Sequence, residues 1–244
     1  MNLFGLTDTG KVRADNQDSY AIRVLDDDLA VAVVCDGMGG AQAGNVASAV
    51  AVETFAAAVE EACRQQLPET EREREHLMRE ACYKANQVVH DLSLSTPEYH
   101  GMGTTLVGLL IQGDAACVVN VGDSRAYLFR EGTSRQLTLD HSLVQLLVSR
   151  GELTPEQARV HPKKNFITRA LGVDAEVRAD IFHLSVCPGD RLMLCSDGLS
   201  NVLSDQQLLE DCAAGELEDC CRRMMVQTLD DGAPDNVTMV LAQL

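Results

Sequence analysis

The segment that most constrains this chain is Val31–Gly40, which reads VAVVCDGMGG. Its first five residues are apolar without interruption and glycines follow shortly after, a pattern that predicts a short buried strand. Asp36 comes directly after this run, and a buried carboxylate is costly unless a cation or several hydrogen-bond donors meet it. Gly37 beside it would leave room for a metal ion or a phosphate to approach the backbone. The segment alone allows two interpretations, a metal ligand or the cap of a turn.

Other carboxylates of the chain favour the metal. An apolar run at 191–195 likewise ends in Ser196-Asp197-Gly198, with an aspartate followed by a glycine. Aspartates stand at, or just ahead of, five junctions between predicted strands and loops: Asp18, Asp36, Asp123, Asp197 and Asp235. If these junctions converge, the carboxylates cannot all stay ionised close together without cations. An all-oxygen ligand set suits Mg²⁺ or Mn²⁺ better than zinc, so the pattern predicts such a site.

Charge and cysteine spacing limit the partners and the compartment. The chain has 37 acidic and 20 basic residues, a net charge of -17, and is therefore repelled by nucleic acid and by anionic membranes. Its nine cysteines include no C-x-x-C pair and are predicted to be reduced core residues. The chain begins without a signal-peptide pattern and has no long apolar stretch. We expect a cytoplasmic protein with neither nucleic acid nor membrane as a partner.

Periodicity predicts a mixture of helices and antiparallel strands. Residues 41–66 and 70–92 have helical spacing and are expected to form an antiparallel hairpin laid over a sheet. Further helices are predicted at 143–148, from 154, at 205–213 and at 218–229. Strands are predicted near 4–7, 19–25, 29–35, 104–111, 115–121, 126–130, 177–184, 191–195 and 237–241. Short connections favour antiparallel pairing. We expect one domain over 1–244, with 139–172 as a flap over a site.

Three motifs that suggest other enzymes fail on inspection. Residues 5–12, GLTDTGKV, have the spacing of a phosphate-binding loop, but Val12 stands where the metal-binding Ser or Thr is required. Residues 122–126, GDSRA, lack the last glycine of a hydrolase nucleophile elbow, and a strand is predicted where a helix should follow. No cysteine has the C-x5-R spacing of thiolate phosphatases. A nucleotide-binding loop, a serine hydrolase and a cysteine phosphatase are thus excluded.

Six blocks resemble, in order, the signature blocks of the metal-dependent serine/threonine protein phosphatases of type 2C, and together they extend over most of residues 7–241. They are Arg13-x-x-Asn16-Gln17-Asp18, Asp36-Gly-Met-Gly-Gly40, Gly101-Met-Gly-Thr-Thr105, Val121-Gly-Asp-Ser-Arg125, Ser196-Asp-Gly198 and Asp235-Asn236. The short DGMGG form is similar to that of compact bacterial members. One block would be weak evidence, whereas six in order are highly specific.

This resemblance implies an α+β fold, a four-layer α/β/β/α sandwich of two antiparallel sheets flanked by helices. It implies a binuclear centre of Mn²⁺ or Mg²⁺ at one edge between the sheets, with a third, weaker ion nearby. The implied activity is hydrolysis of phosphoserine and phosphothreonine by a metal-activated water. Expected partners are phosphorylated Ser/Thr proteins and a cognate Ser/Thr kinase that the enzyme opposes, and the expected state is a monomer.

The resemblance also assigns the metal ligands. It implies that Asp36 bridges two ions and that the Gly37 carbonyl binds one of them. Asp197 and Asp235 complete the other. Asp123, together with Asp197, is implied to hold the third ion.

The remaining roles include two departures from the family pattern. Arg13 is implied to grip the substrate phosphate, because a guanidinium matches phosphate oxygens bidentately, and Asp18 to act through water. Gln17 replaces a Glu of many relatives, which removes a charge near one ion. Met38 replaces a His suspected of protonating the leaving group. Since Met38 cannot be an acid, a metal-bound water would have to supply the proton.

Two alternatives to a protein phosphatase stay open. One is a catalytically weak, metal-linked regulatory module that binds phosphoproteins, and the other is a hydrolase of small phosphoesters. His141 and His161, both in the expected flap, are predicted to be solvated loop residues rather than catalytic acids.

Overall fold

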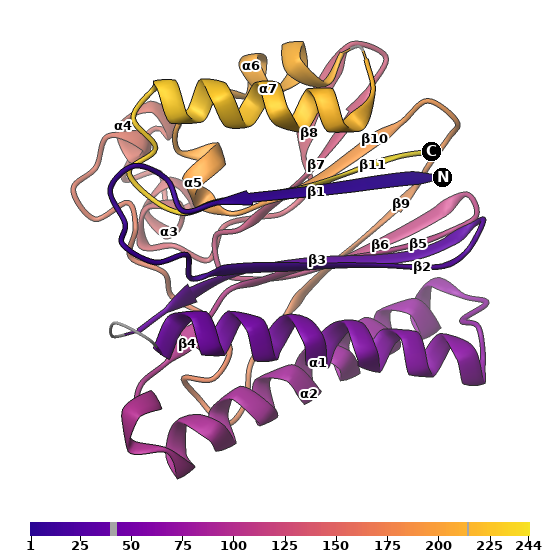
Figure 1. Cartoon of the computed structure of the whole chain (residues 1–244), viewed down its shortest axis with the longest axis horizontal. Coiled ribbons are helices and arrows are strands. Elements are labelled where there is room, and N and C mark those ends of the chain that lie inside the picture. The colour runs from indigo at the N-terminus through magenta and orange to yellow at the C-terminus, as the bar shows by residue number, and fades with distance from the viewer. Residues whose placement is uncertain (40–42, 214) are drawn as a thin grey trace.

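The computed structural model describes residues 1–39, 43–213 and 215–244 (Figure 1). Gly40 of the glycine-rich segment and the predicted helix start at residue 41 lie outside these residues. Two antiparallel sheets face each other, and helices cover their outer faces. The predicted fold class, an α+β four-layer sandwich, is confirmed.

The first sheet joins the two ends of the chain. Its strands in spatial order are β1 (Asn2–Asp8), β11 (Val237–Gln243), β10 (Arg191–Cys195), β7 (Arg125–Arg130) and β8 (Thr133–Gln136). The neighbour of β1 in this sheet is not the next strand along the chain but the last. β1 pairs along its whole length with β11, so the termini lie side by side in Figure 1. The reason is burial: Phe4 and Leu6 pack into the core beneath helix α7 (Leu217–Asp230).

The second sheet contains the segment Val31–Gly40. Its strands in order are β2 (Asp18–Asp26), β3 (Leu29–Met38), β5 (Leu106–Gln112), β6 (Ala115–Val121) and β9 (Asp180–Ser185), and β4 (Gly103–Thr104) pairs with the end of β3. β3 is buried on both faces, since Val33 packs toward the helices and Val34 toward the other sheet. Its continuous apolar run reflects this two-sided burial.

Helices form both outer layers. Besides α7, the helices of the described residues are α1 (Ala43–Gln65), α2 (Glu71–Ser95), α3 (Leu143–Ser149), α4 (Pro155–Arg159), α5 (Asp197–Ser200) and α6 (Asp205–Cys212), with a 3₁₀ turn at Pro97–Tyr99. Of these, α3 and α4 lie at one end of the sandwich (Figure 1). α1 and α2 form the predicted antiparallel hairpin over the second sheet, and α6 and α7 lie over the first (Figure 1). Small residues let α1 approach the strands closely: a Cβ on Gly108 of β5 would lie 2.6 Å from the Phe55 ring.

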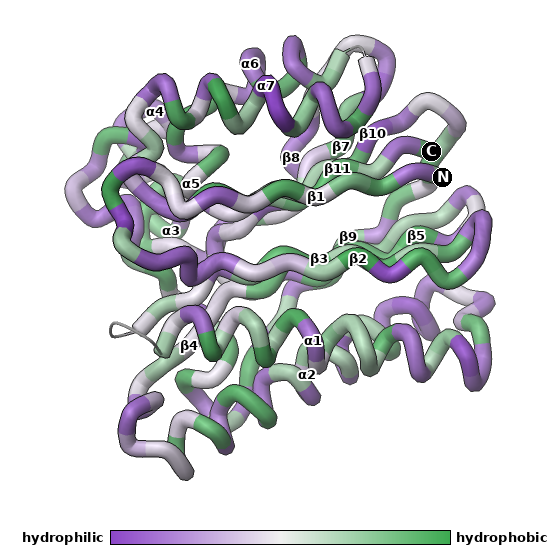
Figure 2. Tube along the Cα trace, in the orientation of Figure 1, coloured by the Kyte–Doolittle hydropathy of each residue, from purple (hydrophilic) through white to green (hydrophobic). Residues whose placement is uncertain are grey.

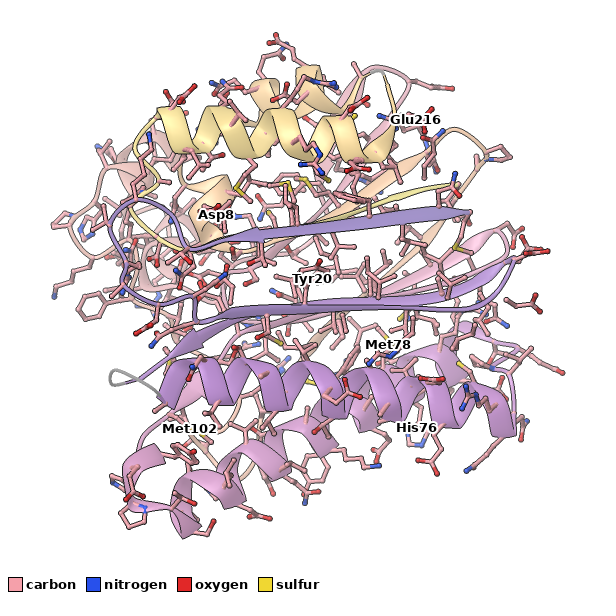
Figure 3. All side chains as sticks on the ribbon, viewed as in Figure 1. Asp8, Tyr20, His76, Met78, Met102 and Glu216 are labelled. Atoms are coloured by element: carbon pink, nitrogen blue, oxygen red, sulfur yellow. The ribbon has the colours of Figure 1, made fainter. Side chains whose placement is uncertain are left out.

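The two sheets pack through a layer of aliphatic side chains. Val34 and Leu109 of one sheet join Leu194 and Val240 of the other in a single buried cluster. Tyr20 stands between the sheets (Figure 3), and its hydroxyl donates to the Gly5 carbonyl at 3.2 Å. Hydrophobic residues recur along the strands and at intervals along the covering helices (Figure 2). Buried side chains therefore hold the sandwich at three places: between the two sheets, and between each sheet and the helices that cover it.

Several sequence predictions need correction. β9 begins at Asp180 rather than at 177, and neither β8 nor α5 was expected, because one has the polar sequence TSRQ and the other is a single turn. Cys187 is exposed in a turn, whereas the other eight cysteines are buried as predicted. Within the described ranges, no helix is both long and apolar enough to cross a membrane.

Candidate metal centre

The predicted carboxylates converge at one edge of the sandwich. Asp18 and Asp36 lie directly opposite each other in the β2–β3 pair. Asp36 was expected just after the end of its strand. It lies within β3 instead, because the strand continues beyond it and pairs with β4. Asp197 is the first residue of α5, and Asp123 and Asp235 lie in loops next to β6 and β11. The site thus draws on both sheets.

Electrostatics show that these groups are neighbours. The pKa of Asp36 is raised well above its usual value by desolvation and then by the charges of the other four aspartates. Burial raises the pKa of Asp18 to about 7 and that of Asp197 to about 6. Burial and the nearby Asp197 also raise the pKa of Asp123. Such a cluster requires positive charge to be fully ionised.

Orphaned oxygens support the fit of this site to a hard cation. The Oδ1 atoms of Asp18 and Asp197 are buried and have no hydrogen-bond partner among the described residues. Unpartnered buried oxygens are costly, and oxygen donors are the ligands that Mg²⁺ and Mn²⁺ prefer. As they stand in the described ranges, no three His, Cys, Asp or Glu side chains are arranged so that they could hold a metal ion. The donor chemistry therefore fits, while the side chains are neighbours rather than a finished cage.

The glycines beside two of the aspartates lie where another segment of backbone passes very close. A Cβ on Gly37 would lie 2.0 Å from the Gly44 carbonyl oxygen, and one on Gly198 would lie 1.9 Å from the Asn236 carbonyl oxygen. The position that a Cβ of Gly37 would take is thus filled by the Gly44 backbone. Both glycines allow another segment of the chain to pass close to an aspartate.

Arg13 lies at the rim of the cluster. Its Nη2 donates to Asp235 Oδ2 at 2.8 Å, and its side chain is 52% exposed. The loop that carries it is held by Asn236, whose Nδ2 donates to the Thr9 and Asp15 carbonyls at 2.9 and 3.0 Å. The backbone amide of Gln17 in turn donates to Asn236 Oδ1 at 2.8 Å. Asn236 belongs to a recognised block, but its bracing role was not predicted.

A serine links Asp18 to the other sheet. Ser196 Oγ donates to Asp18 Oδ2 at 2.7 Å and accepts the Thr238 amide at 3.0 Å. On the β3 side, the Asp36 amide donates to Thr105 Oγ1 at 2.9 Å. Ser196 thus orients Asp18, and Thr105 holds the backbone of Asp36. In the sequence, the only sign of these roles is that both residues belong to the recognised blocks.

His141 contradicts its prediction. It is only 6% exposed, and both ring nitrogens have partners, so it is not a solvated loop residue. The sequence misses this because its partners, Gly122 and Asp180, are far along the chain. His161 is half-buried in a loop, where its Nδ1 accepts the Lys163 amide at 3.1 Å.

Comparison with known proteins identifies the class. The protein phosphatase 2C profile matches residues 10–241. A serine/threonine phosphatase, stp, from Listeria welshimeri is 36% identical over 97% of this chain and 93% of its own length. The structure of Stp1 from Staphylococcus aureus superposes with a TM-score of 0.92 at 34% identity, covering 99% of this chain and 94% of that one.

A third relative contains metal. The catalytic domain of the serine/threonine protein phosphatase PstP, in complex with two manganese ions, has a TM-score of 0.85 and 34% identity over 99% of this chain and 97% of that one. These matches extend over nearly the whole chain. The chain belongs to the protein phosphatase 2C family, and the predicted class, a metal-dependent phosphoprotein phosphatase, is confirmed.

Proposed function

We propose that this protein hydrolyses phosphoserine and phosphothreonine in proteins with a water activated by two Mn²⁺ or Mg²⁺ ions, and so opposes a Ser/Thr kinase. The observation that carries this proposal is the set of mutually repelling carboxylates around Asp36 at the edge between the sheets. Manganese in PstP supports the choice of metal. The proposed partners are phosphorylated Ser/Thr proteins, and the proposed state is a monomer in the cytoplasm.

The ligands proposed for the two ions are Asp36, the Gly37 carbonyl, Asp197 and Asp235, and Asp123 with Asp197 is proposed for a third. When bound, the cations supply Lewis acidity and lower the pKa of the attacking water. The raised pKa values of the aspartates in the protein alone indicate that cations would release bound protons from them.

The chain's own residues position the phosphate. Arg13 stands beside Asp235 at the exposed rim, where its guanidinium can donate hydrogen bonds to two phosphate oxygens without burial. Asp18, held by Ser196, is proposed to orient a water rather than to bind an ion directly. No residue need form a covalent phosphoenzyme, since water attacks phosphorus.

Met38 cannot protonate the departing serine or threonine oxygen.

Residues 139–172, which include α3 and α4, are proposed as a flap of the single catalytic domain. Lys163 and Lys164 in that segment offer positive charge to acidic phosphopeptides.

The test compares p-nitrophenyl phosphate with a phosphothreonine peptide, each with Mn²⁺ and with chelator. Wild-type protein should hydrolyse the peptide only with metal. Asp36→Asn should abolish this activity, whereas Asp114→Asn, the same charge change in an exposed turn, should not. Activity that survives chelation overturns the metal mechanism. Hydrolysis of the small ester alone favours a small-phosphoester hydrolase, and bound metal without turnover favours a regulatory module.

A further inference from the structure

His141 lies outside the set of carboxylates, yet its surroundings connect to that set. It follows β8 and precedes α3, at the start of segment 139–172, and its imidazole is buried. The backbones of His141 and Gly122 are joined, since the His141 amide donates to the Gly122 carbonyl at 2.9 Å. The Gly122 amide donates back to the imidazole Nδ1 at 3.1 Å. Two hydrogen bonds therefore hold the residue that precedes Asp123.

Gly122 is held from its other side as well. Its φ is +107°, and a Cβ there would lie 2.5 Å from Thr105 Cγ2. Thr105 accepts the amide of Asp36 and pairs with the Ser124 hydroxyl at 2.7 Å. The turn that carries Asp123 is thus clamped between Thr105, which touches Asp36, and His141. The position of the Asp123 backbone depends on both contacts.

Hydrogen-bond chemistry fixes the state of the imidazole. Because Nδ1 accepts an amide hydrogen, the neutral ring carries its proton on Nε2 and donates to Asp180 Oδ2 at 3.1 Å. Arg169 Nη1 also lies 3.1 Å from Nε2, but two donors cannot bond each other, so its partner is Asp180 Oδ1 at 3.0 Å. Burial, the main cause, lowers the pKa of His141, which favours this neutral form.

The far end of the segment closes on the same residue. The Thr168 amide donates to the His141 carbonyl at 2.7 Å, and Arg169 completes the contact with Asp180. One buried residue therefore joins both ends of segment 139–172 to the turn of Asp123. The two hydrogen bonds between His141 and Gly122 are therefore the link between this segment and that turn.

We propose that His141 is a positioning residue that fixes the Gly122–Asp123 backbone against segment 139–172 and so sets the affinity of the weaker cation subsite formed by Asp123 and Asp197. This rests on the proposed function. His141 touches neither the substrate nor an ion in this scheme. Residues that orient metal ligands through hydrogen bonds are typically worth about ten- to a hundredfold in metal affinity.

Three variants separate the contacts. His141→Asn places an amide oxygen near the position of Nδ1 and keeps an acceptor for Gly122, but it does not reach Asp180. His141→Leu removes both contacts. Asp180→Asn leaves the imidazole in place and weakens both its far contact and the ion pair of Asp180 with Arg169. It serves where His141→Leu does not fold, and it should have the same effect in smaller measure.

The first measurement uses metal-free protein. We expect the Gly122 and Asp123 amides to exchange hydrogen slowly in wild type and in His141→Asn, and at least about tenfold faster in His141→Leu. The ¹⁵N shifts of the wild-type ring should report a proton on Nε2. A Gly122 amide that stays equally protected in His141→Leu, or a proton on Nδ1, overturns the proposal.

The second measurement is a Mn²⁺ titration that is monitored by calorimetry and by electron paramagnetic resonance. His141→Leu should bind the weakest ion about tenfold less tightly and the other two as wild type does, and His141→Asn should restore the weak site. Equal weakening of all sites without rescue indicates a merely structural role and overturns the proposal. Wild type that binds no Mn²⁺ and has no activity overturns the proposed function instead, and the amide-exchange result still decides the role of His141 in the turn.

Discussion

The same short pattern, an apolar run followed by aspartate and glycine, ends in different structures at two places. At Asp36–Gly37 the chain remains a strand as far as Met38, whereas at Asp197–Gly198 it turns into the helix α5. In both, a carbonyl oxygen from another segment of the chain fills the space that a Cβ on the glycine would take. The shared motif therefore reports a close backbone approach beside a carboxylate, not a shared secondary structure.

Neighbouring residues decide the difference. The backbone of Asp36 is paired on both sides of its peptide, because the Asp36 amide donates to Thr105 Oγ1 and the Asp36 carbonyl accepts the Thr105 amide at 2.8 Å. Asp197 instead begins the helix α5. Its carbonyl accepts the Asn201 amide at 2.7 Å, and its Oδ2 accepts from the Asn201 side chain at 2.9 Å. One aspartate is fixed by a neighbouring strand and the other by its own helical turn.

The largest effect should come from replacing the two aspartates. Asp36→Asn and Asp197→Asn should each lower Mn²⁺-dependent peptide hydrolysis by more than about a hundredfold, since even the partners of metal ligands are worth that much. Asp36→Asn should cost more, because all four other aspartates act on Asp36. Without metal, both variants should be more heat-stable than wild type, since one repelling carboxylate is gone. Thermal unfolding with chelator that shows a loss of stability would contradict this.

The two glycines should be the next most sensitive positions. Gly37→Ala and Gly198→Ala each force a methyl group onto a backbone oxygen, and we expect a loss of about 1–3 kcal/mol or more in unfolding free energy. Chemical denaturation measures it. Gly113→Asn is the control, because that turn has a φ of +57°, which Asn tolerates, and nothing within 4 Å. If only one junction is sensitive, the parallel between them fails.

The metal-free protein should lose stability as the pH rises. The folded-state pKa of Asp197 is about 6 and that of Asp18 about 7, both above the usual value of 3.8. Folded protein therefore holds protons that the unfolded chain has already released, and this contribution is full below about pH 4 and lost through pH 6–7. We expect the melting temperature with chelator to fall by on the order of 5 °C between pH 5 and 8. Saturating Mn²⁺ should remove the fall, and a fall that persists would show that other groups cause it.

The smallest effects should come from the two hydroxyls that hold the aspartates. Thr105→Val leaves the Asp36 amide without its acceptor, and Ser196→Ala removes the donor to Asp18. Each should cost about 1–3 kcal/mol of stability. Ser196→Ala should also raise the pKa of Asp18 further, which carboxyl NMR can measure, whereas Thr105→Val should leave it unchanged. A raised pKa of Asp18 in Thr105→Val, with no change in Ser196→Ala, would contradict the assignment of Ser196 as the residue that holds Asp18.

Much of the fold could be predicted because its signals are local. The continuous apolar run of β3, the helical spacing of α1 and α2 and the turn residues between strands each specify their own element. The five aspartates were found because each adjoins a strand and belongs to a recognisable block. The pairing of β1 with β11, the strand β8 and the burial of His141 were missed, since each depends on partners distant in sequence.

The sequence by itself determined the apolar runs, the positions of the acidic residues and the family to which the chain belongs, because those properties reside in residue type and spacing. Only the tertiary structure decided which aspartates face one another, which backbone fills the space beside Gly37, and what His141 holds. The physical reason is that a carboxylate's pKa and a glycine's necessity are set by whatever atoms lie within a few ångströms. At this site those atoms come from both sheets and from opposite ends of the chain.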